Sequence, residues 1–453
     1  MMDENIIKKI VKFTQKLTSG KDFNKAEAYL ILKLINNSNR NFKVYEGIIL
    51  LYYFSKFKEF PNKDYGKFAN NEILEKCVFL LNGGILSPLE IGNLFLDILT
   101  YPNDPQKRDI LMGYFYGALW SFMNNSKNLE IAVNYGLAII KSAFSLDNFD
   151  IDRKIKLTSE VKVINLAGSG KKETKLLNIS SMNAIITAAV GKVLGKNILI
   201  TKTASRSTSS VTGSTDIFES AGINLNLPIE KMIEIMLKTG VGIFDINRIV
   251  PKLNQVYNGR LYDVQVFAGL VGGAAIVNPI DADLINYGLT RGSTQLCLAI
   301  LSKLYPKKNI LVIQGKNYNG KPVIDQVSIN GNTEIAQSIK GQIVIKTVTP
   351  KDFGFCFKPI KYIESRQNTI ENLSEFIKLL AGKSNESIKQ VVAMEVALNL
   401  LGLEIVNDLK YGANLAVEVI NSGEGIRVIE DLIYYSGGDV EKFNRLTKLL
   451  LCE

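Results

Sequence analysis

Two short apolar runs, each ending in a loop of small polar residues and followed by a helical pattern, constrain the fold of this chain most. Val161–Leu166 leads into a glycine-rich loop, and the alanine-rich helical pattern of Ser180–Val193 follows. Ile198–Thr201 leads into a Ser/Thr-rich loop, and Asp216–Ala221 reads as the next helix. Alternation of strand and helix favours a mostly parallel sheet that is flanked by helices.

The remaining chain divides into a helical first part and a mixed second part. Up to about residue 150, apolar residues recur every three or four positions, which predicts helices, with Asp22 and Ser87 as helix starts. Beyond residue 150, further strands are expected at Ile310–Gln314 and Gln342–Ile345, with a helix at Ser293–Leu304 ahead of the first, and helices again from Ile370 onward. The helices predicted in the first part are Ile6–Leu17, Ala26–Ile35, Tyr45–Phe57, Ile73–Leu81, Ile110–Met123 and Leu129–Phe144.

The chain has no histidine, and this absence removes several classes of chemistry. Ser-His-Asp and Cys-His nucleophile pairs are excluded, as are histidine-ligated zinc sites. Any general acid–base catalysis would have to use Asp, Glu, Lys, Tyr or Cys. Heavy use of Lys and Asn offers a compositional explanation for the missing histidine.

The net charge and the cysteine content limit which partners and which cellular compartment we expect. A formal charge of +10 favours anionic partners, among them nucleic acid and phosphorylated small molecules. Because the basic residues are scattered, nucleic acid is not required as a partner. The four cysteines form no CxxC pair, no apolar stretch of membrane length occurs, and the first residues lack a signal-peptide pattern. We therefore expect a cytoplasmic protein without membrane contact.

The first loop, Gly168–Ser181, has the composition of an anion-binding turn. Small residues let backbone N–H groups approach an anion, and the following helix N-terminus adds its dipole. Ser180 and Ser181 open that helix, so their hydroxyls either cap it or contact a phosphate. Glycine-rich loops also serve as plain turns, and that alternative stays open.

The second loop, Lys202–Asp216, combines many hydroxyl groups with the cations Lys202 and Arg206. Lysine supplies a point charge, arginine a planar fork, and Ser and Thr short neutral donors, which together suit a polyphosphate. A solvated Ser/Thr turn is the alternative. Two such loops at the carboxyl ends of parallel strands predict a ligand at that edge of the sheet.

Several motifs of the chain resemble the anthranilate phosphoribosyltransferase group and, more distantly, the nucleoside phosphorylases. The transferase pattern GTGGDGxxTFNIST matches Gly168–Ser181 at equal length, and KHGNRxxSSxxGSAD matches Lys202–Asp216. Further elements that resemble the family are Leu17–Asp22, Ser87-Pro88, Asn278-Pro279, Gln314-Gly315 with Asp325-Gln326, Thr349–Gly354 and Glu418–Gly423.

The resemblance implies transfer of a phosphoribosyl group from phosphoribosyl pyrophosphate to a nitrogen acceptor, with Mg²⁺ bridging pyrophosphate and carboxylates. It implies a small helical domain, 1–150, with about 90 extra residues, and an α/β domain, 151–453, with a segment near 225–265 returning to the helical domain. It also implies a cleft between the domains and a homodimer. Residues implied to bind substrate are Gly168, Ser169, Gly170, Lys171, Lys172, Asn178, Ser180, Ser181, Lys202, Ser205, Arg206, Ser209, Ser210, Ser214 and Arg260, and those implied for magnesium are Ser180, Asp325 and Gln326.

The chain departs from the family at positions that matter for metal and acceptor. The family's Gly-Asp in the first loop is Lys171-Lys172, and the second acid of its metal pair is Gln326. The histidine and asparagine of the acceptor side are Thr203 and Ser205. These changes argue against anthranilate as the acceptor. Three hypotheses stay open: a phosphoribosyltransferase with another acceptor, a phosphorolytic enzyme, and an inactive relative that binds nucleotide, nucleic acid or a protein.

Overall fold

A computed structural model describes residues 2–38, 42–66, 71–102, 104–123, 126–170, 174–207, 211–257, 269–270 and 273–451. The chain forms two compact units. The first comprises Met1–Phe149 and Gln255–Val271, and the second comprises Asp150–Asn254 and Gly272–Glu453. None of the helices in the described ranges is both long and apolar enough to cross a bilayer.

The first unit is helical throughout its described part, and its core is built on α3 and α7. These two helices approach closely because Gly47 and Gly113 face each other, and a Cβ on Gly47 would lie 2.0 Å from the Ile110 carbonyl oxygen. The elements are α1 (Met2–Thr18), α2 (Lys25–Asn36), α3 (Lys43–Phe57), α4 (Lys63–Gly66), α5 (Asn71–Leu81), α6 (Pro88–Leu99), α7 (Pro105–Ala118), α8 (Trp120–Met123), the 3₁₀ turn η1 (Ser126–Asn128) and α9 (Leu129–Ser145).

One of the two predicted helix starts in this unit is confirmed and the other is wrong. Ser87 caps α6 by accepting a hydrogen bond from the Glu90 N–H at 3.3 Å. Asp22 does not start α2, because Asn24 accepts from the Glu27 N–H at 2.9 Å and Glu27 returns the bond to the Asn24 N–H. A complete capping box therefore sets this boundary two residues later.

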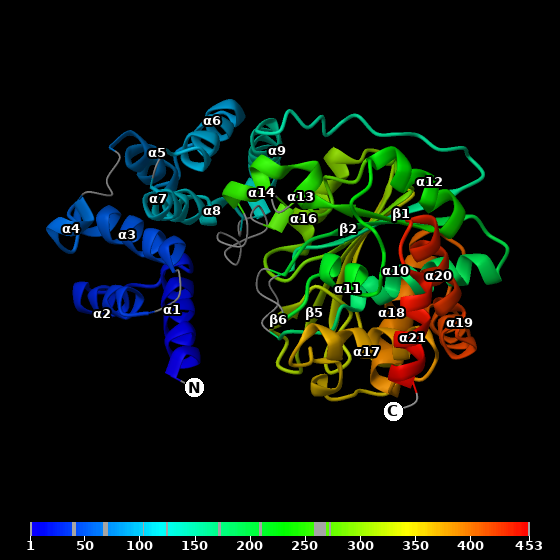
Figure 1. Ribbon diagram of the computed structural model, residues 1–453. Coiled ribbons are helices and arrows are strands. Elements are labelled where there is room, and N and C mark those ends of the chain that lie inside the picture. Colours follow the sequence, from blue (N-terminus) through cyan, green and yellow to red (C-terminus); the bar gives the residue numbers. More distant parts are fainter. Residues whose placement is uncertain are drawn as a thin grey trace. The chain divides into compact units, whose positions relative to one another are not determined.

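The second unit contains an eight-stranded sheet in the order β3-β2-β1-β4-β5-β7-β8, with β6 also paired to β5 (Figure 1). The five strands from β3 to β5 are parallel, and β6, β7 and β8 are antiparallel to their neighbours. The expected mostly parallel α/β sheet is confirmed. The strands are β1 (Lys162–Gly168), β2 (Ile198–Ala204), β3 (Val241–Asp245), β4 (Leu284–Gly288), β5 (Asn309–Lys316), β6 (Pro322–Ile324), β7 (Thr333–Ile339) and β8 (Gln342–Val348).

Helices cover both faces of this sheet. The chain moves from β1 through α10 to β2 in one direction and from β4 through α16 to β5 in the other, so right-handed crossovers place α10 and α16 on opposite faces. The C-terminal helices gather around α10 (Figure 1). The helices are α10 (Ile179–Val193), α11 (Ser214–Ser220), α12 (Ile229–Thr239), α13 (Ile246–Ile249), α14 (Pro251–Tyr257), α16 (Thr294–Leu304), α17 (Thr369–Leu380), α18 (Glu386–Gly402), α19 (Leu409–Ser422), α20 (Glu424–Tyr435) and α21 (Val440–Leu451), with 3₁₀ turns η2 (Pro350–Phe353) and η3 (Ile360–Ile363).

The segment that joins the first unit from later in the chain differs from the expected 225–265. It runs from Gln255 to Val271, because α12 and β3 belong to the second unit. The pairing of β3 with β2, from Ile200 opposite Val241 to Ala204 opposite Asp245, holds this part of the chain in the sheet.

Candidate functional site

The first loop lies at the point where the strand order of the sheet reverses, between β1 and β4. In open α/β sheets, ligands bind at the carboxyl ends of the strands at such a reversal. The loop is fixed to the end of β4: the Ser169 N–H donates to the Gly288 carbonyl at 2.8 Å, and the Thr290 N–H donates to Ser169 Oγ at 2.9 Å. The Thr290 hydroxyl donates in turn to the Gly170 carbonyl.

Asp325 packs directly against this loop. Its Oδ2 accepts a hydrogen bond from the Gly170 N–H at 2.9 Å, and Gly170 has a left-handed φ of +67°. A Cβ on Gly168 would lie 2.7 Å from Asp325 Oδ2, and one on Gly288 would lie 2.0 Å from the Asp325 carbonyl oxygen. Glycine at these positions therefore permits the approach of the turn that carries Asp325 and Gln326.

The second loop is closed on itself by Asp216. Asp216 Oδ2 accepts from the N–H groups of Ser207 at 3.0 Å and Gly213 at 2.8 Å. A Cβ on Gly213 would lie 2.4 Å from both the Ser205 carbonyl oxygen and the Ser207 nitrogen. The close approach of these two parts of the loop therefore also requires glycine. The acidic residue in this loop thus shapes the backbone.

The two cations of the second loop have different surroundings. Lys202 is buried at the carboxyl end of β2, and its Nζ donates to the Thr203 carbonyl at 2.7 Å. Arg206 is exposed and forms a bidentate pair with Glu219, with N–O distances of 2.8 and 2.9 Å. The Glu219 carboxylate raises the pKa of Arg206 further. Of the two, Lys202 has the environment of a buried anion-binding cation.

The start of α10 joins the two loops. Asn178 Nδ2 donates to the Thr212 carbonyl of the second loop at 3.1 Å. The Thr212 hydroxyl accepts from Asn372 Nδ2 of α17 at 2.9 Å. The Asn178 side chain therefore connects the first loop to the second. Ser180 and Ser181 follow it in the first turn of the helix.

Several buried oxygen atoms near these loops have no hydrogen-bond partner among the described residues. They are Ser181 Oγ, Thr203 Oγ1, Thr215 Oγ1 and Gln326 Oε1. Buried polar atoms in proteins are nearly always hydrogen-bonded, so these oxygens call for a partner outside the chain, such as water or ligand, as do similar atoms away from the loops, for example Ser302 Oγ. The four come from the two loops and from the Asp325-Gln326 turn.

The structure places the described site residues on these elements. Ser205 and Ser214 lie opposite each other in the second loop, where the Ser205 N–H donates to Ser214 Oγ at 3.4 Å. Sequence reasoning missed Thr290 and Asn372, which carry no local motif and reach the loops only through tertiary contacts. Five predicted residues lie outside the described residues: Lys171, Lys172, Ser209, Ser210 and Arg260.

The oxygen donors near the first loop fit magnesium only in part. Asp325 supplies a carboxylate, while Ser180 and Gln326 would supply neutral oxygens. Across the described ranges, no three His, Cys, Asp or Glu side chains are grouped so that they could hold a metal ion. Magnesium in phosphate sites is commonly held by one or two carboxylates together with substrate oxygens. This donor set therefore fits an ion bound largely through a ligand's phosphates.

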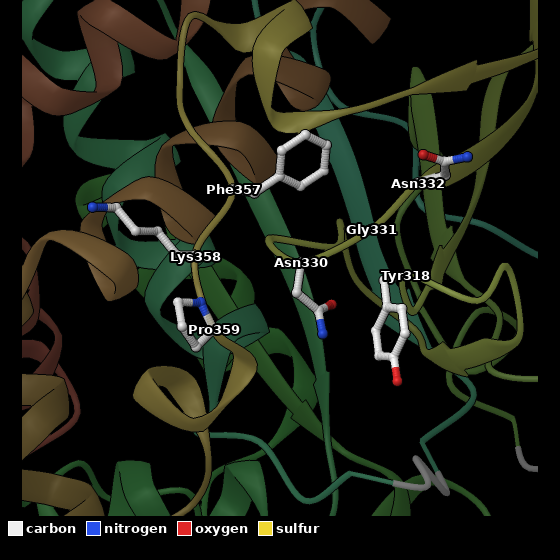
Figure 2. A pocket seen from close by; sticks show the side chains of 7 residues that line it. All are labelled: Tyr318, Asn330, Gly331, Asn332, Phe357, Lys358 and Pro359. Carbon is white, nitrogen blue, oxygen red and sulfur yellow. The ribbon is translucent and has the colours of Figure 1, made fainter.

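A shallow pocket lies elsewhere on the second unit, with a volume of about 600 Å³. Figure 2 shows Phe357 and Tyr318 on either side of Asn330 and Gly331, with the Lys358 ammonium group directed away from both rings. The β5–β6 turn, the loop after Ser328 and the segment before η3 form it. None of the predicted site residues lines this pocket.

A family profile described as "Glycosyl transferase family, a/b domain" matches residues 160–426, which is more than half of the chain. This chain belongs to that glycosyl transferase family. The matched range contains both loops, the Asp325-Gln326 turn and the whole sheet.

Curated relatives within the family are anthranilate phosphoribosyltransferases, which confirms the resemblance found in the motifs. The protein of Geobacter sulfurreducens is 24% identical over 286 residues, covering 63% of this chain and 77% of the relative. That of Trichodesmium erythraeum is 25% identical over 365 residues, covering 79% and 95%.

Solved anthranilate phosphoribosyltransferases share the fold. The Saccharomyces cerevisiae enzyme in complex with phosphoribosyl pyrophosphate and magnesium has a TM-score of 0.63 at 16% identity, covering 82% of this chain and 99% of that one. The Thermus thermophilus enzyme has a TM-score of 0.59 at 20% identity, covering 80% and 99%.

Proposed function

We propose that this member of the glycosyl transferase family transfers a phosphoribosyl group from phosphoribosyl pyrophosphate to a nitrogen acceptor other than anthranilate, releasing pyrophosphate. The observation that carries the proposal is the first loop, fixed at the reversal of the strand order by its bonds to Gly288, Thr290 and Asp325. The relatives are named as anthranilate phosphoribosyltransferases, which supports the same donor here.

In this proposal the first loop and the start of α10 bind the donor. Gly168–Gly170 hold the turn against β4 and Asp325, the hydroxyls of Ser180 and Ser181 contact the donor's phosphates, and Lys202 balances their charge. Lys171, Lys172, Ser209 and Ser210 are part of the same proposed site. Departure of pyrophosphate is aided mainly by positioning and by positive charge around the leaving group.

Magnesium belongs to the proposal as an ion bound through the donor's pyrophosphate. Asp325, Ser180 and Gln326 would face it, and its charge would stabilise the departing pyrophosphate when bound. The single carboxylate of the Asp325-Gln326 pair supports weaker binding of the ion than a pair of carboxylates would give.

The acceptor side of the proposal rests on Thr203 and Ser205. A yeast relative was solved with 4-fluoroanthranilate. In this chain a threonine and a serine take the positions where resembling transferases carry histidine and asparagine, and the Thr203 hydroxyl is buried without a partner among the described residues. A small neutral hydroxyl favours an acceptor with its own hydrogen-bonding group over an aromatic acid. Arg260 is the proposed acceptor-binding cation.

Calorimetric titration of the protein with phosphoribosyl pyrophosphate in the presence of Mg²⁺ tests donor binding. We expect saturable binding that Ser181→Ala weakens by about 10-fold, since one buried hydroxyl contact to a charged group contributes about 1.5 kcal/mol. Ser302→Ala is the matched control, because Ser302 Oγ on α16 is also buried without a partner but lies outside the loops. Absence of binding by the wild-type protein would refute the proposed donor.

Release of pyrophosphate in the presence of candidate amines then identifies the acceptor. Turnover with anthranilate as the preferred acceptor would contradict the acceptor part of the proposal. Phosphate-dependent release of base from nucleosides would instead favour the phosphorolytic alternative.

A second candidate is a family member that binds the donor or another nucleotide without turning it over. The loss of one carboxylate at Gln326 favours this candidate, because the metal would be held less well. Donor binding without pyrophosphate release for any nitrogen acceptor would support it.

A further inference from the structure

Glu395 is a charged side chain buried inside the second unit, on α18. Only 4% of its surface is exposed, and the residues of α18 from Val391 to Leu400 are buried on all sides. A carboxylate in such a place destabilises the fold unless hydrogen bonds satisfy it. Its partners therefore indicate why an acidic residue stands here.

The Glu395 carboxylate contacts two elements of the candidate site. Oε1 accepts a hydrogen bond from the Val327 N–H at 2.6 Å, and Oε2 lies 3.5 Å from Asn183 Nδ2. Val327 is two residues after Asp325, whose carboxylate holds the first loop. Asn183 lies one helical turn after Ser180 on α10.

A buried network extends from this carboxylate to the strand at the reversal of the sheet. Asn399 Nδ2 donates to Asn183 Oδ1 at 2.9 Å and to Thr187 Oγ1 at 3.0 Å. Asn286 Nδ2, on β4, donates to Asn399 Oδ1 at 2.6 Å. Asn286 lies two residues before Gly288, which accepts from Ser169. The network therefore connects α10, α18, β4 and the Asp325-Gln326 turn.

We infer that Glu395 is a positioning residue that fixes the Asp325–Val327 turn relative to α10, so that Asp325, Gln326, Ser180 and Ser181 face one ligand. The inference rests on the proposed function. Residues 325–328 lie outside any strand or helix, and their backbone is held by the Val327 bond to Glu395 together with the Ser328 N–H, which donates to Thr333 Oγ1 at 2.9 Å. The role requires an acceptor at Oε1; a glutamine amide oxygen supplies it, while the glutamine amide nitrogen gives up only the long 3.5 Å contact with Asn183 Nδ2.

Amide hydrogen exchange and donor titration of three full-length variants test the inference. Glu395→Met fills the volume without an acceptor, Glu395→Gln keeps the acceptor without the charge, and Gln390→Ala removes another buried polar side chain of α18. Gln390 Nε2 donates to the Cys356 carbonyl at 2.8 Å, away from the loops. We expect Glu395→Met to speed exchange in residues 325–329 by at least about 10-fold and to weaken affinity for phosphoribosyl pyrophosphate by about 10-fold.

The other two variants separate positioning from general stability. Glu395→Gln is expected to keep exchange and affinity within about threefold of the wild type, and Gln390→Ala to lower the unfolding midpoint while leaving both unchanged. Unchanged exchange in Glu395→Met, or equal loss in Glu395→Gln, would overturn the inference.

Two outcomes separate the inference from the proposed function. If the wild-type protein binds no phosphoribosyl pyrophosphate, the proposed function fails, while the exchange measurement still tests the turn. If Glu395→Met does not fold, hydrogen exchange of the Val327 amide in the wild-type protein tests the inference instead. This amide should exchange as slowly as the amides of β5, and rapid exchange would contradict the bond to Glu395.

Discussion

Lys202 and Arg206 are four residues apart and carry the same charge, but only Lys202 is buried. Arg206 is exposed, and its charge is balanced by Glu219 and, at 3.4 Å, by Asp216. We therefore expect Lys202→Ala to weaken binding of phosphoribosyl pyrophosphate by about 10- to 100-fold, as loss of a charge-assisted bond implies. Arg206→Ala should change it by less than about threefold. Calorimetric titration of both variants measures the difference, and equal losses would refute the distinction.

Ser180 is the second single-residue test of the donor site. Its side chain is half-buried in the first turn of α10, two residues after Asn178, which contacts the second loop. We expect Ser180→Ala to weaken donor affinity by about 10-fold and to leave the unfolding midpoint within about 2 °C. If this variant and Lys202→Ala both bind the donor as tightly as the wild type, the site assignment is wrong.

Lys154 is a half-buried lysine away from the loops, and it makes stability depend on pH. Its Nζ donates to the carbonyls of Ile276 at 2.8 Å and Asn278 at 2.6 Å. Burial lowers the pKa of Lys154 to about 8, although the carboxylates of Asp152, Asp150 and Asp281 oppose the change. Between this pKa and the usual value of about 10.4, the unfolded state binds more protons than the folded state.

The free energy of unfolding should therefore rise with pH through this window. From about pH 7.5 to about pH 9.5, we expect the wild type to gain about 2 kcal/mol relative to Lys154→Met. Urea denaturation of the two proteins at both pH values measures this difference. A constant difference between them would show that the pKa of Lys154 is not lowered on folding.

At the scale of elements, glycines let the Asp325-Gln326 turn contact the ends of β1 and β4. Gly288→Ala would place a Cβ 2.0 Å from the Asp325 carbonyl oxygen, and both are backbone positions that cannot yield independently. We expect a loss of about 1–3 kcal/mol in the free energy of unfolding together with loss of donor binding. Gly331→Ala is the control, because its Cβ would lie 2.3 Å from the Lys316 carbonyl oxygen, away from the loops. Denaturation and titration should show destabilisation in both variants and lost affinity only in Gly288→Ala; intact affinity in both would contradict this packing argument.

The same elements show how far sequence patterns reach. β1, β2, β5 and β8 were predicted, as were α10, α11 and α16 and the two loops, because apolar runs that end in glycine or hydroxyl residues are local signals. β3 and β4 were not predicted, although β4 lies at the centre of the sheet. Leu284–Gly288 is buried at every position, so it shows no alternation, and a short run of Leu, Ile, Asn, Tyr and Gly does not distinguish a strand from a helix.

The long-range partners of the site could not be predicted from the sequence either. Thr290 is 121 residues from Ser169, and Asn372 is 160 residues from Thr212. Neither belongs to a motif, and only the register of β1 with β4 and the packing of α17 bring them to the loops. The sequence therefore predicted the two loops of the candidate site but not the side chains that hold them.

At the scale of the whole molecule, the described site elements belong to the second unit, whereas the one tryptophan, Trp120, lies in α8 of the first. Two units with separate cores favour more than one unfolding transition. A ligand that binds the folded second unit stabilises it by about 2.7 kcal/mol at 100 times its dissociation constant. Tryptophan fluorescence thus reports on the first unit during heating, whereas far-ultraviolet circular dichroism reports on both units and so includes the unfolding of the second.

We expect phosphoribosyl pyrophosphate with Mg²⁺ to raise the midpoint seen by circular dichroism by about 5 °C and to change the fluorescence midpoint much less. Ser181→Ala should reduce the rise, while Ser302→Ala should preserve it. If the fluorescence midpoint rises as far as the circular dichroism midpoint, the donor stabilises both units together, and a donor site confined to the second unit is wrong. If neither midpoint moves although calorimetry detects binding, the ligand does not distinguish folded from unfolded chain, which would contradict contacts to buried hydroxyls at the reversal of the sheet.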